Sequence, residues 1–291
     1  MDYDTMIIGQ VCLDTNTDFD GRTEHRFGGA VLYSGHAAAA IGKRVAVVPK
    51  CNPADIDLSK AFEGCPVTLF PKTSSRSTLM ENVYFTADRE RRRSRCLAVI
   101  DPYTVSDIPD VRTNVYHLAG LCYGDIGTDI IVALAERADV AMDIQCMLRH
   151  VEPDLTLKLH DWPEKTKYLR YIRYLKTDAA EAEILTGTDD REKAARMMFD
   201  WGAREIVITH NTEVIAYDGK KIYRAPLKPR NLSGRTGRGD TTFSAYITER
   251  QTTGIQEALT FSAAMVSLKM ETPGPFKGSR ADVLDYLRQF Y

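Results

Sequence analysis

The chain has 291 residues, 44% of them hydrophobic and 27% charged, a balance typical of a soluble globular protein. Its net charge of −2 gives no general attraction to nucleic acid or anionic membranes, and no run approaches the ~20 apolar residues that span a bilayer. The scattered cysteines form no Cys-x-x-Cys pair, so we expect neither a disulfide framework nor a zinc site. Because the N-terminal segment is acidic and unlike a secretory signal, we expect a cytoplasmic protein.

Short apolar runs alternate with helical patterns along the chain. The first half predicts strands at 6–12, 45–48, 115–119 and 140–143, and helices at 30–41 and 129–137. The second half predicts a strand at 205–209 and helices at 191–201, 241–250, 255–270 and 280–290. This alternation indicates an α/β protein in which crossover helices join parallel strands.

One region departs from this alternation. Strand-like segments at 77–84 and 94–99 flank a highly charged turn at 88–93. Such a hairpin does not belong in a parallel core, so we expect it to project as a small sheet or lid. The basic run from Arg89 to Arg95 leaves a nucleic-acid patch as an alternative, although local charge runs are usually solvated and the whole chain lacks a basic footprint.

A glycine-rich segment near the C-terminus carries the clearest chemical signal. Gly234, Gly237 and Gly239 precede Asp240 and a predicted helix. Their N–H groups can converge on an anion, and a helix N-terminus adds partial positive charge at the same point. Asp240 is either a helix N-cap or, beside a bound phosphate, a base for an attacking hydroxyl. The combination indicates phosphoryl transfer, and neither a P-loop nor a dinucleotide fingerprint fits the glycine spacing.

The same residues allow an unrelated interpretation. Arg238, Gly239 and Asp240 spell the Arg-Gly-Asp tripeptide of adhesion ligands. A position at the start of a helix would not present this tripeptide on a mobile tip, so the sequence disfavours adhesion.

The glycine-rich segment resembles the C-terminal signature of the ribokinase-like (PfkB) family of carbohydrate kinases, usually Asp-Thr-x-Gly-Ala-Gly-Asp. The resemblance implies a single three-layer α/β/α domain over 1–291, with a mostly parallel sheet and a β lid from about 12–27 and 72–100. It implies an anion hole at Gly237, Arg238 and Gly239, with Thr236 at the nucleotide and Asp240 as catalytic base. Arg238 departs from the family pattern, as does the preceding Arg235.

A second signature concerns the substrate. Gly28, Gly29 and Tyr33 resemble the family's Gly-Gly-x-x-x-Asn, with Tyr33 in place of the asparagine, as in branches that include inositol kinases. Asp14 matches the family's sugar-hydroxyl-binding aspartate. Arg149 ends a segment similar to Asp-x-Gln-x-x-x-Arg, which implies contact with substrate or phosphate.

Further matches imply metal and nucleotide contacts. Asp178 and Glu181 resemble the family's Asn-x-x-Glu, which organises magnesium and phosphate through water; the alternative is the acidic first turn of a helix. Thr209 and Asn211 resemble a strand end, Thr-x-Gly, that meets the nucleotide. Ser262 lies in a small-residue helix that resembles the one lining the adenine pocket of relatives, although close helix packing explains such residues equally well.

The resemblance implies an ATP-dependent kinase of a small sugar or polyol, with Mg²⁺ as cofactor and the need for a monovalent cation left open. Inositols, hexoses and their acids, and ribosides remain possible acceptors. A nucleoside or inositol kinase of the same fold, or a catalytically degenerate ligand-binding homologue, are the alternatives. Relatives often dimerise through the lid, so a homodimer is a further expectation; we expect no nucleic-acid or membrane partner.

Overall fold

The computed structural model describes residues 2–86 and 91–291. Within these residues a central sheet contains β1 (Tyr3–Gln10), β4 (Val45–Cys51), β5 (Thr68–Leu69), β6 (Lys72–Thr73), β9 (Thr113–Leu118), β10 (Asp139–Asp143), β13 (Tyr174–Asp178), β14 (Glu205–Thr209), β15 (Glu213–Tyr217) and β16 (Ile222–Pro226). The strand order is β16-β15-β14-β13-β10-β9-β1-β4-β5, and β6 also pairs with β4. Strands β15 and β16 are antiparallel to their neighbours, and the other pairs are parallel.

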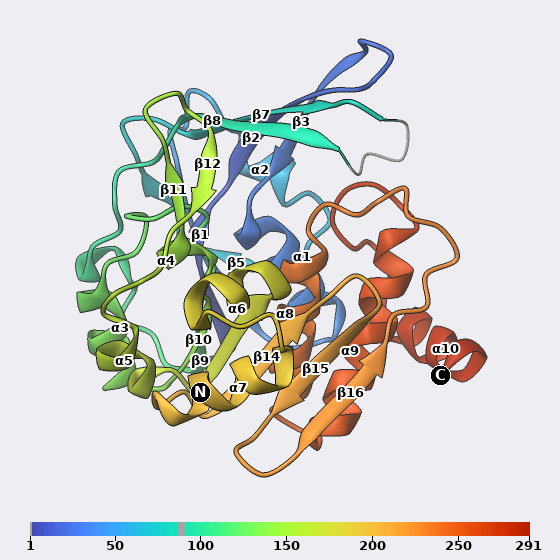
Figure 1. Cartoon of the computed structure of the whole chain (residues 1–291). Coiled ribbons are helices and arrows are strands. Elements are labelled where there is room, and N and C mark those ends of the chain that lie inside the picture. The colour runs from blue at the N-terminus through green and yellow to red at the C-terminus, as the bar shows by residue number, and fades with distance from the viewer. Residues whose placement is uncertain (1, 87–90) are drawn as a thin grey trace.

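Helices cover both faces of this sheet (Figure 1). One face packs against α1 (Ala30–Ala40), α8 (Arg238–Glu249) and α9 (Ile255–Met270), with α10 (Arg280–Phe290) outside α9. The other face packs against α3 (Thr128–Ala135), α6 (Ala179–Thr186) and α7 (Arg191–Asp200). Short helices lie in the connections: α2 (Leu58–Ala61), η1 (Val105–Asp107), α4 (Gln145–Leu148), α5 (Lys165–Tyr168) and η2 (Leu169–Tyr171). This arrangement confirms the three-layer α/β/α fold.

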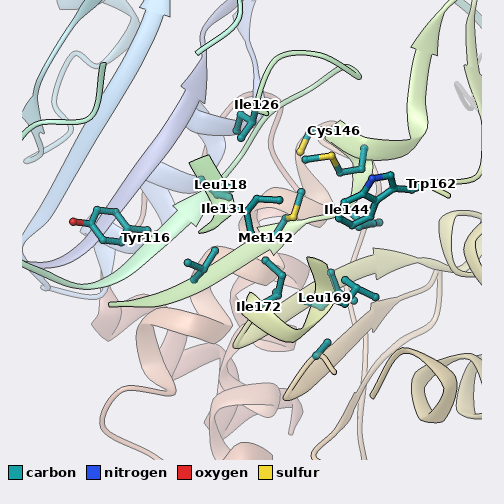
Figure 2. Close-up of a cluster of buried hydrophobic side chains, with 14 of the residues drawn as sticks. Tyr116, Leu118, Ile126, Ile131, Met142, Ile144, Cys146, Trp162, Leu169 and Ile172 are labelled. Atoms are coloured by element: carbon teal, nitrogen blue, oxygen red, sulfur yellow. The ribbon is translucent and has the colours of Figure 1, made fainter. Parts of the chain in front are cut away.

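The larger apolar core fills the space between the sheet and α3, α6 and α7. Figure 2 shows part of it, where Leu118 of β9 and Met142 of β10 meet Ile131 of α3. These side chains are fully buried, and the cluster also includes Trp162 from the loop after β12 and Leu169 from η2. Burial of this apolar surface is the main driving force that holds the helices on the sheet.

A second sheet lies above the carboxyl ends of the parallel strands (Figure 1). This small sheet has the order β3-β2-β7-β8 and consists of β2 (Cys12–Thr17), β3 (Thr23–Gly28), β7 (Thr78–Tyr84) and β8 (Arg92–Ala98). A hairpin of β11 (Arg149–Val151) and β12 (Leu157–Leu159) is tied to β8 by a bridge between Arg95 and Thr156. The first residues of the predicted charged turn, 88–90, including Arg89, lie outside the described residues.

The start of α8 differs from the prediction. The helix begins at Arg238 rather than at residue 241, and Gly237 is its N-cap, so Asp240 lies in the first turn and is not the cap. Gly239, which the prediction left outside the helix, is itself helical. Among the described residues, no helix combines the length and apolar character needed to cross a membrane.

Candidate active site

A cavity of about 590 Å³ lies between the small sheet and the carboxyl ends of the central strands. The strands β10, β13 and β14 end at Asp143, Asp178 and Thr209, and the last two of these residues line the cavity. Ligands of open parallel sheets bind at this edge because the strand ends and helix N-termini converge there. Residues 232–240, named here the glycine-rich loop although their last three residues form the first turn of α8, also line the cavity.

Gly237 fixes the shape of the glycine-rich loop. Its φ of +78° is in the left-handed region, and a Cβ built on it would lie 2.1 Å from Cδ1 of Tyr33. The chain can therefore turn into α8 directly against the Tyr33 ring. The N–H of Arg238 donates to the carbonyl of Arg235 at 3.2 Å, so this amide already has an acceptor inside the loop. The first-turn N–H groups of α8 that follow have no acceptor in the preceding turn of the helix, as at any helix start, and their positive end faces the cavity.

We expect Gly237→Ala to lower phosphotransferase activity strongly, because the new methyl group would displace either Tyr33 or the loop. The left-handed conformation alone should cost about 1–2 kcal/mol. Gly64→Ala is the matched control, since Gly64 has a φ of +72° but open space around a Cβ. Thermal unfolding should show a stability loss in both variants, larger in Gly237→Ala because of the clash with Tyr33, and a kinase assay should show an activity loss confined to Gly237→Ala. Wild-type activity in Gly237→Ala would refute the role given to this turn.

Asp240 is partly buried in the cavity wall, in the first turn of α8. Burial and the charge of Asp143 raise its pKa to about 6, against the opposing charges of Lys176 and Arg149. A carboxylate with a pKa near neutrality is better suited to accept a proton than an ordinary aspartate, and it is still ionised at pH 7.

Lys176 is a site residue that the motifs did not reveal. It is only 3% exposed, and its Nζ donates to both carboxylate oxygens of Asp143, at 2.9 and 3.1 Å, and to Glu181 at 3.4 Å. Burial disfavours its ammonium, but the carboxylates of Asp143, Glu181 and Asp178 outweigh burial and raise its pKa. A Cβ on Gly239 would lie 3.2 Å from this Nζ. A fixed positive charge therefore lies directly beside the glycine-rich loop.

Asp178 and Glu181 form a capping box at the start of α6. Oδ1 of Asp178 accepts from the N–H of Glu181 at 2.8 Å, and Oε2 of Glu181 accepts from the N–H of Asp178 at 2.7 Å. The second oxygen of each carboxylate lies outside this box, and both residues line the cavity. Within residues 2–86 and 91–291, no group of three or more His, Cys, Asp or Glu side chains could hold a metal ion directly. Two carboxylates match the few protein oxygens that a Mg²⁺ ion with several bound waters requires.

Asp14 and Gly28, two of the predicted substrate residues, lie in the neighbouring strands β2 and β3 of the small sheet. Asp14 is 9% exposed, and its Oδ1 accepts from Sγ of Cys12 at 3.0 Å. Burial raises the pKa of Asp14. A Cβ on Gly28 would lie 2.4 Å from Oδ2 of Asp14, so the absence of a side chain there leaves the carboxylate room. Gly29 and Tyr33 line the cavity together with Asp14, whereas Gly28 does not line it.

The small sheet contributes polar side chains that the sequence analysis did not single out. Nδ2 of Asn82 donates to Oδ1 of Asn16 at 3.2 Å, and Oγ of Ser94 donates to Oδ1 of Asn82 at 2.7 Å. These residues come from β2, β7 and β8 and line the cavity together with Arg26 and Arg92. Alternating donors and acceptors of this kind suit a ligand with several hydroxyl groups.

Only some of the residues predicted to bind the nucleotide lie together at the cavity. Thr209 and Thr236 line the cavity. Asn211 lies beyond its lining, but Oδ1 of Asn211 accepts from Nη1 of Arg238 at 2.8 Å. Ser262 is buried inside α9, where its hydroxyl donates to the carbonyl of Leu259 at 2.8 Å, and it does not line the cavity. In this structure the small-residue stretch of α9 packs against other helices.

Basic side chains outnumber acidic ones around the cavity. Arg149, predicted at the substrate, lines it from β11, and its charge opposes the rise in the pKa of Asp240. The basic side chains that line the cavity are Arg26, Arg92, Arg149, Lys158, Lys176, Arg235 and Arg238, against the acidic Asp14, Glu24, Asp178, Glu181 and Asp240. This excess of positive charge suits a strongly anionic ligand.

The cavity thus combines the start of α8, a carboxylate with a raised pKa and a polar wall from the small sheet. No family model matches the chain. A cytidine kinase of Thermococcus kodakarensis is 36% identical over 70 residues, which is 23% of this chain and 25% of that protein, so the match spans only a quarter of that relative.

Solved structures give a similarity over the full length. A pyrophosphate-dependent kinase in the ribokinase family, solved as a sulfate complex, is 33% identical with a TM-score of 0.89, covering 97% of this chain and 99% of the other. A pyrophosphate-dependent kinase in the ribokinase family, complexed with a pyrophosphate analog and myo-inositol, gives 33% identity and a TM-score of 0.88 over the same shares. The chain belongs to the ribokinase family of kinases.

Proposed function

We propose that this chain transfers a phosphoryl group from pyrophosphate to a hydroxyl of a small polyol, with Asp240 as general base. The observation that carries the proposal is the position of Asp240 in the first turn of α8, next to Gly239, where a Cβ would lie 3.2 Å from the buried ammonium of Lys176. A base at this point lies next to groups that attract phosphate, as phosphoryl transfer requires.

The chain's own residues account for the proton and the charge in this reaction. The acceptor hydroxyl, bound near Asp14, gives its proton to the carboxylate of Asp240 as its oxygen bonds to the transferred phosphorus. The bond from that phosphorus to the bridging oxygen of pyrophosphate breaks, and orthophosphate leaves. First-turn N–H groups of α8 and the ammonium of Lys176 stabilise the negative charge on the group in transit, which is mainly electrostatic catalysis.

Asp178 and Glu181 are the residues that we propose to hold Mg²⁺ through water. Bound there, Mg²⁺ supplies neutralising charge for the donor phosphates. Lys176 donates to Glu181, and its positive charge also interacts with that of Asp178, so this acidic pair does not carry uncompensated charge.

Two observations favour pyrophosphate over the ATP expected from the motifs. First, Arg238 replaces the small residue of the family signature, and its guanidinium reaches Asn211 at the strand end where the motifs predict the nucleotide. Second, Ser262, the predicted adenine contact, is buried away from the cavity. A short, highly charged donor would use the cations that line the cavity and needs no adenine pocket. The pyrophosphate-dependent relatives support the same donor.

For the acceptor we propose an inositol-like polyol. Tyr33 stands in place of the family's usual asparagine, and the array of Asn16, Asn82 and Ser94 offers several hydrogen bonds to a ring of hydroxyl groups. A relative of similar fold was complexed with myo-inositol. We further propose that the chain acts in the cytoplasm, where its six free thiols would stay reduced.

Dimerisation through the small sheet also stays a proposal. Phe19, Phe85 and Leu97 are exposed on or beside its strands, with 55%, 54% and 42% of their surface accessible. Sedimentation analysis of the wild type and of Leu97→Glu tests it.

The donor proposal makes a specific prediction for Arg238. We expect Arg238→Ala to lower kcat/KM for pyrophosphate by on the order of tenfold to a hundredfold, the usual effect of losing a hydrogen bond to a charged group. Arg196→Ala, on the half-exposed face of α7, is the control and should leave the rate unchanged. Use of ATP by the wild type, with no turnover of pyrophosphate, would refute the donor assignment and restore the expectation from the motifs.

A further inference from the structure

Lys269, near the end of α9, is a buried cation that the proposed reaction does not use. It is only 2% exposed, although lysine is rarely buried without a charged partner. Its Nζ donates to the carbonyl oxygen of Gly234 at 2.5 Å and to that of Thr236. The same ammonium lies 5.1 Å from the centroid of the Tyr33 ring. The side chain thus ends directly behind the glycine-rich loop.

The groups around this ammonium are those that suit a monovalent cation. Backbone carbonyl oxygens replace the hydration shell of such ions, and an aromatic face adds a favourable cation–π contact. Both hydrogen bonds of Lys269 go to main-chain carbonyls, and the carboxylate whose charge reaches it is Asp240. Burial lowers the pKa of Lys269 to about 8, against the opposing effect of Asp240, so the ammonium form predominates at pH 7.

The position of these carbonyls in the chain shows which segment the ammonium of Lys269 holds. Gly234 and Thr236 flank Arg235, and Thr236 immediately precedes Gly237, the N-cap of α8. Gly234 is also fixed by its N–H, which donates to the carbonyl of Met270 at 2.7 Å, next to Lys269 in α9. The end of α9 therefore holds both sides of the turn from which the phosphate-binding helix start emerges.

We propose that the ammonium of Lys269 is a built-in monovalent cation that positions the phosphate-binding loop, so that this chain needs no free potassium or sodium ion. The proposal rests on the proposed function in one respect, the role of that loop in binding phosphate. Lys269 acts through the loop and is a positioning residue. The motifs left open whether the chain requires a monovalent cation. Here the carbonyl oxygens of Gly234 and Thr236 already bind the ammonium of Lys269, which would repel a second cation.

The wild type provides the first test. Phosphotransferase activity is measured at constant ionic strength in the chlorides of potassium, sodium, ammonium and tetramethylammonium. We expect the same rate in all four salts. Strong activation by potassium or ammonium over tetramethylammonium would overturn the proposal, and this test needs no variant to fold.

The variant Lys269→Ala provides the second test, because it removes the ammonium and leaves room for a small ion. In tetramethylammonium chloride we expect its kcat to fall by about 10²-fold, comparable to the loss of one group that stabilises the transition state. Potassium or ammonium ions should restore most of that loss. Lys228→Ala is the matched control, since the ammonium of Lys228 also donates to a main-chain carbonyl, of Phe290, and lies 4.7 Å from the Tyr291 ring, outside the cavity lining.

Thermal unfolding without substrates separates this inference from the proposed function. Potassium or ammonium should raise the melting temperature of Lys269→Ala and leave those of the wild type and Lys228→Ala unchanged. A chain that phosphorylates no polyol but shows this ion-specific stabilisation would refute the function and support the built-in cation. A Lys269→Ala variant with wild-type activity, or one that no small cation restores in activity or stabilises, would overturn the inference.

Discussion

Asp240→Asn should reduce kcat for polyol phosphorylation by on the order of 10³-fold, the range expected when a general base is removed. Asparagine keeps the size and the helix position of the side chain but cannot accept the hydroxyl proton. The assay follows the polyol phosphate formed from pyrophosphate in the presence of Mg²⁺. Asp285→Asn, on the exposed face of α10, is the control and should keep the wild-type rate.

Two further measurements distinguish the loss of a base from damage to the fold. The wild-type kcat/KM should fall as the pH drops through about 6, because protonation of Asp240 removes the acceptor for the hydroxyl proton. The folded-state pKa of Asp240 lies above its unfolded value, so ionising it costs stability as the pH rises. At pH 8 the Asp240→Asn variant should therefore unfold at or above the wild-type temperature. Near wild-type turnover by this variant would contradict its role as base.

Lys176→Met should lower kcat by about 10²–10³-fold, because the positive charge beside the glycine-rich loop stabilises the phosphoryl group in transit. The change also leaves the buried carboxylates of Asp143 and Glu181 without their ammonium, and breaking such a pair costs about 3–5 kcal/mol. Kinetics and thermal unfolding are therefore measured on the same samples.

The double variant Lys176→Met, Asp143→Asn separates the two effects of this change. Neutralising Asp143 removes one of the unpaired charges, so part of the lost stability should return while kcat stays low. Recovery of wild-type kcat in the double variant would show that Lys176 only neutralises Asp143, and it would contradict a direct role for its charge in phosphoryl transfer.

Segments with a strong apolar periodicity could be predicted from the sequence, because the residues that determine them lie close together in the chain. The predicted bounds of α9 and α10, 255–270 and 280–290, agree with the structure, and Ser279 with Asp282 forms a capping box that fixes the start of α10. The strands β13, β15 and β16 were not predicted. All three are short, and Lys176 and Arg224 interrupt the apolar pattern of β13 and β16. In β15 four apolar residues follow one another without alternation, so periodicity does not identify it as a strand.

Some residues of the candidate site could also be predicted from the sequence, and others could not. The glycine spacing predicted a phosphate-binding helix start, because its signal is contained in a few adjacent residues. Lys176 and Lys269 were missed because each is a lysine whose meaning depends on distant partners, Asp143 and Gly234, which lie 33 and 35 residues away in the sequence. A lysine inside an apolar strand or helix face was the available signal, since such positions are rarely charged.

The most direct test of the proposed function is ³¹P NMR of the purified chain with Mg²⁺, pyrophosphate or ATP, and a panel of inositols, pentoses, hexoses, sugar acids and nucleosides. We predict a polyol phosphate ester and an equal amount of orthophosphate from pyrophosphate with an inositol, and neither product with Asp240→Asn. Formation of no phosphate ester from either donor with any of these acceptors would contradict the proposed function.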